Sequence, residues 1–166
     1  MTEAILDPNY WRERMLRATG GNMHHAIFRC SYERWRRIEE KHREILARTI
    51  GEDDSVLDCG CGWGRLLDLM PDQWDGAYLG IDLSPDFVAK AERDHPEKGG
   101  QFLEADLRRL PSLYQEFDWA ILVSIRPMVR RNCGDEVWAE MEGEIRRVAR
   151  KLLYLEYDEN DEGSIE

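Results

Sequence analysis

The sequence predicts an α/β fold: a doubly wound, mainly parallel sheet of about five strands, with helices on both faces and an N-terminal helical cap. Short apolar runs alternate with segments of helical spacing over residues 51–157. A glycine-rich turn, residues 60–64, follows the first apolar run. Three of the runs end in an aspartate, at Asp58, Asp82 and Asp106, each 24 residues from the next. Because parallel strands end on one rim of the sheet, we expect these carboxylates to lie together.

Length and composition place the chain among single-domain proteins. Its 166 residues suffice for one core, and we expect one domain: a helical cap over residues 1–50, a core over 51–157 and an acidic tail over 158–166. The sequence has no apolar run of membrane-spanning length and no basic signal-peptide opening, which predicts a cytoplasmic protein. The spacing of Cys59 and Cys61 suits neither a zinc site nor an easy disulfide, so reduced thiols and no metal are expected.

Charge is distributed unevenly along the chain. The net charge is −11, but residues 11–50 carry +5 and the remainder carries −16. An acidic balance argues against nucleic acid as a partner, because such binding depends on neutralising phosphates. For the basic segment we expect a solvated helix face with internal ion pairs, Glu40 and Glu44 lying near Lys41 and Arg36.

Two helices are expected before the core. Residues 9–18 form a short one that Gly20 and Gly21 close. Residues 31–49 form a longer one with Ser31 as N-cap and an apolar face that includes His42, which we interpret as a core histidine.

The core is expected to alternate strands and helices in order. A strand ends at Asp58, and a helix then runs from the glycine turn to about Met70. The further strands are 77–82, 101–106, 118–124 and 152–157, and the further helices are 84–95 and 135–150. Residues 107–116 are a loop or short helix, residues 126–133 a loop, and the acidic tail is expected to be mobile.

The glycine turn and the acids suggest a nucleotide-like ligand. A turn without side chains lets a ligand approach the backbone, and amides at a helix start favour an anionic group. A dinucleotide fingerprint requires glycine where Arg65 stands, which argues against a nicotinamide oxidoreductase. An acid after the second strand suits ribose hydroxyls, and one after the third suits an exocyclic amine.

These motifs resemble those of the class I (Rossmann-like) S-adenosylmethionine-dependent methyltransferases. The matching segments are Val56–Arg65, Gly80–Ser84 and Ala105–Leu107, and the resemblance covers about residues 50–157. It implies S-adenosylmethionine as cofactor and methyl transfer as activity. The cofactor-binding residues it implies are Asp58, Gly60, Cys61, Gly62, Trp63, Gly64, Asp82, Leu83, Asp106, Leu107, Ser124, Tyr10, Trp11 and Arg14.

The resemblance also assigns roles within that set. The glycine turn approaches the methionine part, Asp82 holds the ribose, and Asp106 with the Leu107 amide recognises adenine. Ser124 and Ile125 flank the methyl group. Tyr10, Trp11 and Arg14 belong to a segment that closes over the cofactor, where Arg14 meets its carboxylate; simple packing is the alternative for the two aromatic residues.

The sequence does not identify the methyl acceptor. Ser124-Ile125-Arg126-Pro127 replaces the motif of base-amino methyltransferases, and signatures of other nucleic-acid and catechol enzymes are missing. We therefore expect a small molecule or a protein side chain. His24, His25 and Tyr10 are candidate general bases. Arg126, Arg130 and Arg131 are candidates to bind a carboxylate or phosphate; the alternative is pairing with Asp135 and Glu136.

The end of the sequence leaves a second hypothesis open. The family's sheet normally continues into an antiparallel hairpin after the fifth strand, and we expect that hairpin to be missing. The free edge would be exposed, or covered by the N-terminal helices or by a second subunit in a homodimer. A catalytically inactive, cofactor-binding partner subunit is thus the alternative to an enzyme.

Overall fold

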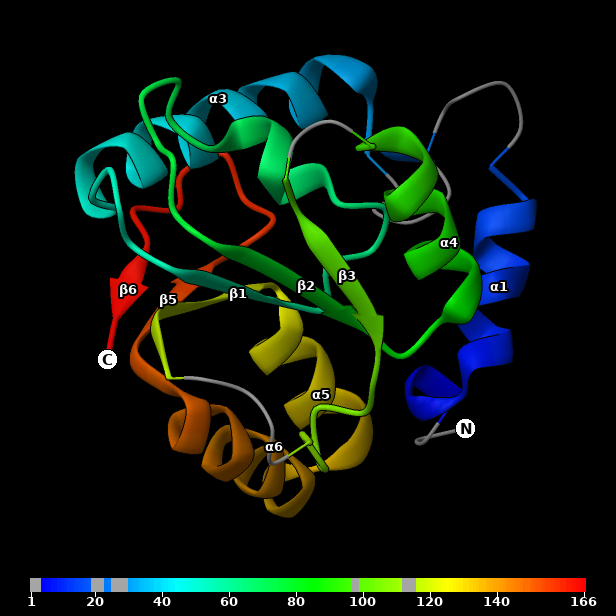
Figure 1. The fold of residues 1–166 in the computed structure, drawn as a ribbon. Coiled ribbons are helices and arrows are strands. Elements are labelled where there is room, and N and C mark those ends of the chain that lie inside the picture. The colour runs from blue at the N-terminus through cyan, green and yellow to red at the C-terminus, as the bar shows by residue number, and fades with distance from the viewer. Residues whose placement is uncertain (1–3, 19–22, 25–29, 97–98, 112–115) are drawn as a thin grey trace.

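The computed structural model describes residues 4–18, 23–24, 30–96, 99–111 and 116–166, which build one six-stranded sheet (Figure 1). The strands are β1 (Val56–Cys59), β2 (Tyr78–Asp82), β3 (Gln101–Glu104), β4 (Phe117–Val123), β5 (Ala149–Leu155) and β6 (Ser164–Ile165). Their order is β3-β2-β1-β4-β5-β6. The pairs among β1–β5 are parallel, and β6 pairs antiparallel to β5. The predicted α/β architecture is therefore confirmed.

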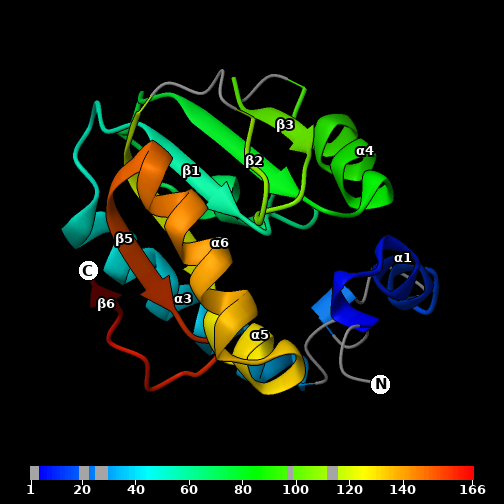
Figure 2. The ribbon, with the colours of Figure 1, turned by 90° about the horizontal axis from the view of Figure 1, so that it is seen from below.

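Helices lie on both faces of this sheet. The α-helices are α1 (Pro8–Leu16), α3 (Tyr32–Thr49), α4 (Pro85–Asp94), α5 (Ile125–Cys133) and α6 (Asp135–Val148), with short 3-10 helices η1 (Ala4–Leu6) and η3 (Arg65–Leu69). In Figures 1 and 2, α3 covers one face, α5 and α6 cover the other, and α4 lies beside β3. Among the described residues, no helix has the length and apolar character needed to cross a bilayer.

The pleat of the strands divides the core between the two faces. Val56 and Tyr78 pack with Ile45 and Leu46 of α3, whereas their chain neighbours Leu57 and Leu79 belong to the opposite cluster under α5 and α6. Successive side chains of a strand point to opposite faces, so a strand covered on both sides is apolar throughout. This explains why the strands appear as uninterrupted apolar runs.

The predicted features of the long helix are confirmed. Ser31 Oγ accepts a hydrogen bond from the Arg34 amide at 3.2 Å, as an N-cap does. The buried residues of α3 are Ile38, His42, Ile45 and Leu46. His42 Nε2 lies 2.8 Å from the Glu156 carbonyl, so it is a core histidine with a partner. Arg36 and Glu40 form the expected ion pair at 3.3 Å.

All four cysteines of the chain are free thiols.

Residues 126–133 form helix α5 and not the predicted loop. Pro127 is compatible with this helix because it stands in the first turn, where backbone N–H groups have no partner inside the helix and proline costs little. Ile125, Met128 and Val129 supply an apolar face at helical spacing that packs on the core.

The segment after the glycine turn is also shorter than predicted. Instead of an α-helix reaching Met70, the chain forms η3, a 3-10 helix of five residues. Met70 is already extended, with φ −60° and ψ 148°, because the residue before proline is pushed away from helical angles.

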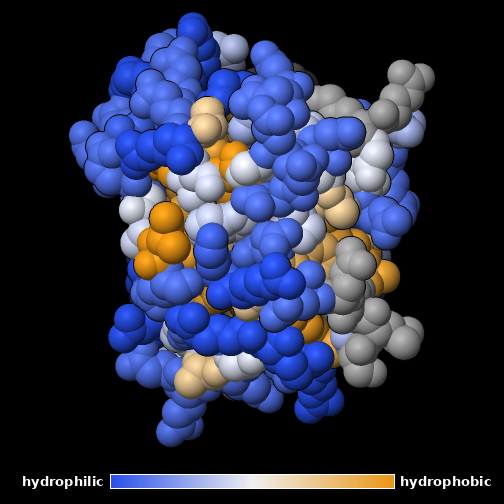
Figure 3. Space-filling view, turned by 60° about the vertical axis from the view of Figure 1, so that its left-hand side comes forward, coloured by the Kyte–Doolittle hydropathy of each residue, from blue (hydrophilic) through white to orange (hydrophobic). Residues whose placement is uncertain are grey.

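The acidic tail is folded onto the protein, so the prediction that it is mobile is wrong. Residues 158–166, which we call the acidic strap, include β6 and pair with basic side chains. Glu162 lies 2.7 Å from Lys41 Nζ, Glu159 pairs with Arg37, and Glu166 lies 2.9 Å from Arg126. Opposite charge on α3 attracts the strap, and β6 gives β5 the outer antiparallel neighbour that the sequence was expected to lack. Seen from the β6 side, the surface is mainly hydrophilic with small hydrophobic areas (Figure 3).

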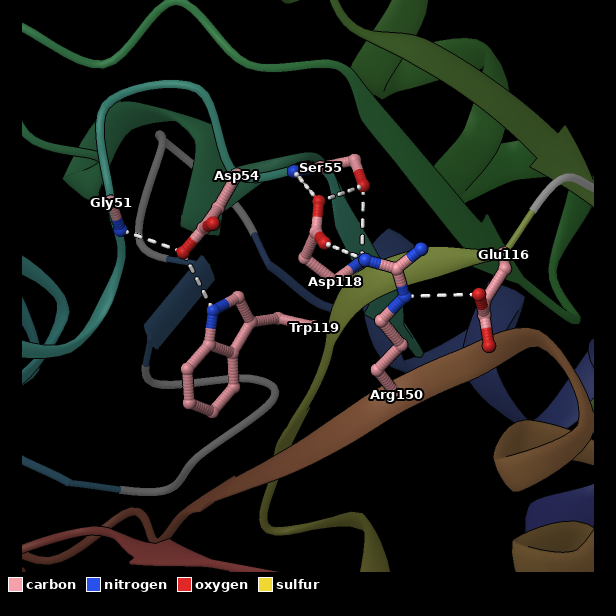
Figure 4. Close-up of polar contacts among 7 residues, drawn as sticks. All are labelled: Gly51, Asp54, Ser55, Glu116, Asp118, Trp119 and Arg150. Carbon is pink, nitrogen blue, oxygen red and sulfur yellow. Dashed lines mark hydrogen bonds and ion pairs between the residues drawn. The ribbon is translucent and has the colours of Figure 1, made fainter.

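A polar cluster joins the strands at their amino-terminal ends (Figure 4). Asp118 Oδ2 accepts hydrogen bonds from both the amide (2.9 Å) and the hydroxyl (2.7 Å) of Ser55, while Ser55 Oγ accepts from the Asp118 amide at 3.0 Å. Arg150 lies 3.1 Å from Asp118 Oδ1 and 2.9 Å from Glu116. These bonds connect β1, β4 and β5 at the edge opposite to the ends at which Asp58 and Asp82 lie.

Candidate functional site

A pocket of about 720 Å³ opens at the carboxyl ends of the strands. Its size is that of a small-molecule site. Most of the predicted cofactor-binding residues line it: Tyr10, Trp11, Arg14, Asp58, Gly60, Cys61, Gly62, Trp63, Asp82, Leu83, Asp106, Leu107 and Ser124. Gly64 does not, because it packs beneath the turn, where an added Cβ would meet His95 at 2.7 Å and Phe102 at 3.0 Å. The three acids, which are separated in sequence, thus share one cavity.

The glycine turn brings backbone to the wall of the pocket. Gly60 and Gly62 both have positive φ, 75° and 54°. A Cβ on Gly62 would find no atom within 4 Å, so this position faces open space, whereas one on Gly60 would lie 2.6 Å from Ile125 Cδ1. Glycine is therefore required here both for its backbone angles and for the space it leaves.

Asp82 is fixed by backbone donors. Its Oδ2 accepts from the Gly62 amide at 2.8 Å and its Oδ1 from the Ser84 amide at 2.9 Å. Burial raises the pKa of Asp82, and these N–H donors offset part of that effect. The carboxylate at the end of β2 is thereby locked against the glycine turn.

Asp106 lies two residues beyond the end of β3 and is held by its neighbour Arg108. The Arg108 side chain reaches both carboxylate oxygens, with Nε 3.0 Å from each and Nη2 2.5 Å from Oδ2. Burial alone would raise the pKa of Asp106, but the hydrogen bonds and charge of Arg108 outweigh it and leave the pKa below its ordinary value. Asp106 therefore stays ionised, as an acceptor, at the rim of the pocket.

Asp58, at the end of β1, has a different environment. It is only 2% exposed, and the Tyr78 hydroxyl donates a hydrogen bond to its Oδ2 at 2.5 Å. Burial raises the pKa of Asp58 to about 7, although Tyr78 and Arg65 both favour the ionised form. A carboxyl group that changes charge near neutral pH therefore lines the pocket.

Arg65 is a buried cation next to Asp58. Its Nη1 lies 2.9 Å from Glu39 Oε1 of α3, its Nη2 lies 3.5 Å from His42 Nδ1, and its guanidinium stands 5.9 Å from the Tyr157 ring centre. The sequence reasoning did not assign a role to Arg65, Tyr78 or Tyr157. The detectable signals were an arginine inside a leucine-rich segment and a tyrosine opening a buried strand.

The N-terminal cap supplies an aromatic wall. The rings of Tyr10 and Trp11 lie 5.0 Å apart in a T-shaped pair, and the Arg14 guanidinium lies over both, 5.5 and 5.8 Å from their centres. Arg14 Nη1 donates to the Tyr10 hydroxyl at 2.8 Å, and Trp11 Nε1 to the Ile5 carbonyl at 2.8 Å. These residues pack with one another and also face the pocket.

Ser124 joins the ends of β4 and β5 at the pocket. Its backbone lies in the left-handed region, with φ 54°, and its Oγ accepts a hydrogen bond from the Tyr157 amide at 2.6 Å. This bond brings the Tyr157 ring to the pocket wall beside Ser124.

The structure does not bring every predicted residue to the pocket. His24 is buried with its ring stacked on Trp35 at 5.2 Å, which does not support it as a general base; His25 lies outside the described residues.

The predicted substrate residues are also placed differently. Arg126 and Arg130 are not part of the lining, since Arg126 pairs with Glu166 and covers the Tyr154 ring, and Arg130 pairs with Asp135 at 2.6 Å. The assignment of these two as substrate residues is therefore corrected: Arg131, on the helical face one position further, lines the pocket with Asn132.

Comparisons with known proteins agree with this geometry. A family profile described as "Methyltransferase domain" matches residues 56–151. A trans-aconitate 2-methyltransferase of Escherichia coli O157:H7 is 43% identical over 67 residues, which span 39% of this chain and 26% of that protein. The matched segment thus spans about a quarter of the length of that relative.

Solved structures show the same fold. The PH0226 protein from Pyrococcus horikoshii OT3 superposes with a TM-score of 0.60 at 25% identity, over 75% of this chain and 58% of that one. The plantazolicin methyltransferase BpumL, solved in complex with a monoazolic desmethylPZN analog and SAH, has a TM-score of 0.63 at 14% identity, over 93% of this chain and 58% of that one. Because the profile covers more than half of its residues, the chain belongs to the methyltransferase domain family.

Proposed function

We propose that the protein transfers a methyl group from S-adenosylmethionine to a small molecule or a protein side chain. The observation that carries the proposal is the single pocket lined by the glycine turn, Asp82 and Asp106. Family membership supports the activity, whereas the acceptor follows only from the shape and charge of the site.

The residues present fit S-adenosylmethionine. The open space at Gly62 lets a ligand approach the backbone, and Asp82 is held ready to accept hydrogen bonds from ribose hydroxyls. Leu83, Leu107 and Met128 add apolar surface to the pocket that Asp106 also lines, which suits an adenine ring with an exocyclic amine. The Tyr10 and Trp11 rings provide π-faces for a sulfonium cation.

S-adenosylmethionine supplies an electrophilic methyl group, so the protein has to align the acceptor, exclude water and, for a protonated acceptor, remove a proton. Ser124 and Ile125 line the pocket beside the glycine turn, where the resemblance locates the methyl group. Of the predicted general bases, Tyr10 alone lines the pocket among the described residues. Its hydroxyl accepts a hydrogen bond from Arg14 Nη1 at 2.8 Å, which fixes the orientation of the phenol at the pocket.

We further propose that the acceptor carries a carboxylate. Arg34 and Arg131 line the pocket, and neither forms an ion pair within the described part of the chain, although the charge of Arg34 acts on Asp158. Arg131 is therefore the stronger candidate, because a guanidinium without an ion-pair partner can bind a carboxylate through two parallel hydrogen bonds. The name of the Escherichia coli relative, which includes trans-aconitate, points to the same acceptor chemistry.

Calorimetry with S-adenosylhomocysteine and with NAD tests the cofactor. We expect binding of the first and none of the second; the reverse would overturn the proposal. Tritium transfer from labelled S-adenosylmethionine to a panel of small carboxylic acids and to protein extract tests the acceptor. Binding without transfer to anything would support the second candidate, an inactive partner subunit that binds the cofactor.

Two further expectations concern the location of the protein in the cell and its oligomeric state. Free thiols at all four cysteines suit a cytoplasmic location, which cell fractionation checks. A homodimer is one of the assemblies that the sequence leaves open, and sedimentation velocity distinguishes it from a monomer.

A further inference from the structure

Tyr78 and Asp58 form a buried hydrogen-bonded pair at the pocket, whose wall includes Asp58. Tyr78 opens β2, lies opposite Val56 in the sheet and is 4% exposed. Its hydroxyl donates to Asp58 Oδ2 at 2.5 Å, and its ring contacts those of Trp74 and Phe102. A buried tyrosine hydroxyl usually has a hydrogen-bond partner, and within the described residues that partner is Asp58, one of the three acids that line the pocket.

The other ionisable groups around Asp58 are few. Asp82 faces it from β2, Arg65 from η3, and the thiols of Cys59 and Cys61 from its own strand and turn. From β4 the neighbour in register is the apolar Ile121. Arg65 is already paired with Glu39, so the charge of Asp58 is only partly balanced within the protein.

We propose that Tyr78 is a positioning residue: it holds Asp58 as the group that binds the ammonium of the cofactor's amino-acid end, and it thereby sets the pH at which the cofactor binds. This rests on the proposed function, since it requires a ligand with an ammonium group beside the glycine turn.

The chemistry follows from hydrogen-bond capacity and charge. Tyr78 has one hydroxyl proton and donates it to Oδ2, which leaves Oδ1 as an acceptor for a ligand. A cation at Oδ1 favours the ionised carboxylate, so binding below neutral pH must release the Asp58 proton to solvent. Tyr78 stabilises the same ionised form, and without its hydroxyl that proton is held more tightly.

Two probes test this: S-adenosylhomocysteine, which has the ammonium, and 5′-methylthioadenosine, which lacks the amino-acid end. Calorimetry would compare wild type, Tyr78→Phe and a matched control, Tyr154→Phe, whose buried hydroxyl has no hydrogen-bond partner within the described residues. For wild type, S-adenosylhomocysteine affinity should fall about tenfold per pH unit below pH ~7. Binding at pH ~6.5 should release about one proton, measured in two buffers of different ionisation enthalpy.

Tyr78→Phe should move this pH dependence upward by about one unit, the size expected for a hydrogen bond to a charged group. Affinity for S-adenosylhomocysteine should then fall about tenfold at pH ~6.5 and less than about threefold at pH ~8.5. The affinity of Tyr78→Phe for 5′-methylthioadenosine should equal that of wild type. Tyr154→Phe should bind both S-adenosylhomocysteine and 5′-methylthioadenosine as tightly as wild type does. Asp58→Asn, which does not ionise, should bind S-adenosylhomocysteine weakly and without pH dependence.

The outcomes separate the alternatives. If Tyr78→Phe lost the same S-adenosylhomocysteine affinity at both pH values, or also lost affinity for 5′-methylthioadenosine, Tyr78 would only support the fold. Either result would overturn the proposal. A pH dependence that persists in Asp58→Asn would overturn it too. If wild type binds neither nucleoside, the proposed function itself fails; if it binds both with no proton release, only this inference fails.

Discussion

At the scale of one residue, the buried His42 of α3 makes folding stability depend on pH. Burial, and then the positive charge of Arg65, lower the pKa of His42 to about 4. Between that pH and about 6.5, the unfolded chain binds a proton at this residue and the folded protein does not. Folding stability therefore falls as the pH decreases through this window.

Replacing His42 by Gln should remove this acid sensitivity. A glutamine amide retains a donor for the Glu156 carbonyl, which His42 Nε2 meets at 2.8 Å, and has no charge to gain. We expect the difference in unfolding free energy between wild type and variant to shift by about 2 kcal/mol in favour of the variant on going from pH ~7.5 to ~5. Urea unfolding at both values measures it. The comparison at pH ~7.5 gives the packing cost alone, and an unchanged difference at pH ~5 would contradict the assignment.

Two glycines allow a matched test of the pocket wall. Gly62 and Gly99 both have positive φ, 54° and 69°, and an added Cβ at either would find no atom within 4 Å. Gly62→Ala and Gly99→Ala should therefore carry similar backbone strain, of about 1 kcal/mol. Gly62 lines the pocket and Gly99 does not. We expect S-adenosylhomocysteine affinity to fall at least about tenfold in Gly62→Ala and to stay within about twofold in Gly99→Ala. Equal effects would show that the turn does not touch the ligand.

At the scale of elements, the polar cluster of Figure 4 joins strands that are far apart in the sequence. Ser55 precedes β1 and Asp118 lies in β4, yet the two exchange hydrogen bonds through both backbone and side chain. Ser55 and Arg150 also hold the pKa of Asp118 below its ordinary value. The cluster lies at the opposite ends of the strands from the pocket, so stability and ligand binding are separable here.

Ser55→Ala should lower the unfolding free energy by about 1–2 kcal/mol, because it leaves the Asp118 amide without its acceptor. S-adenosylhomocysteine affinity should remain unchanged. Ser164→Ala, at an exposed serine of β6, is the control and should alter neither quantity. A loss of affinity in Ser55→Ala would mean that the two ends of the sheet are coupled. Thermal unfolding and calorimetry on the same samples give both readouts.

At the scale of the whole molecule, charge brings α3 and the C-terminal acidic strap together. The basic α3 meets the acidic strap through Arg37, Lys41 and Arg48, which pair with Glu159 and Glu162. Uneven charge along the sequence indicated ion pairs within the basic segment; the structure shows that much of the balance lies between segments more than one hundred residues apart.

Glu162→Gln should lower the urea midpoint at low salt, since it removes partners of both Lys41 and Arg48. The difference from wild type should disappear at about 1 M salt, where exposed charges are screened beyond roughly 3 Å. Glu92→Gln, at an exposed acid of α4 that has no ion pair within the described residues, is the matched control. A midpoint difference that survives high salt would show that the contact stabilises by packing and not by charge.

The sequence by itself determined the parallel sheet and the cofactor-binding residues of the pocket, all of which line it except Gly64. Apolar periodicity marks buried strands, and carboxyl ends of parallel strands share a rim whatever the loops do, so Asp58, Asp82 and Asp106 follow from local pattern. Tertiary structure alone decided that residues 126–133 are helical, that the acidic strap folds back, and that Arg65, Tyr78 and Tyr157 surround the site. The physical reason is that burial, ion pairing and protonation depend on which distant segments meet, and the order of residues along a chain does not specify those distances.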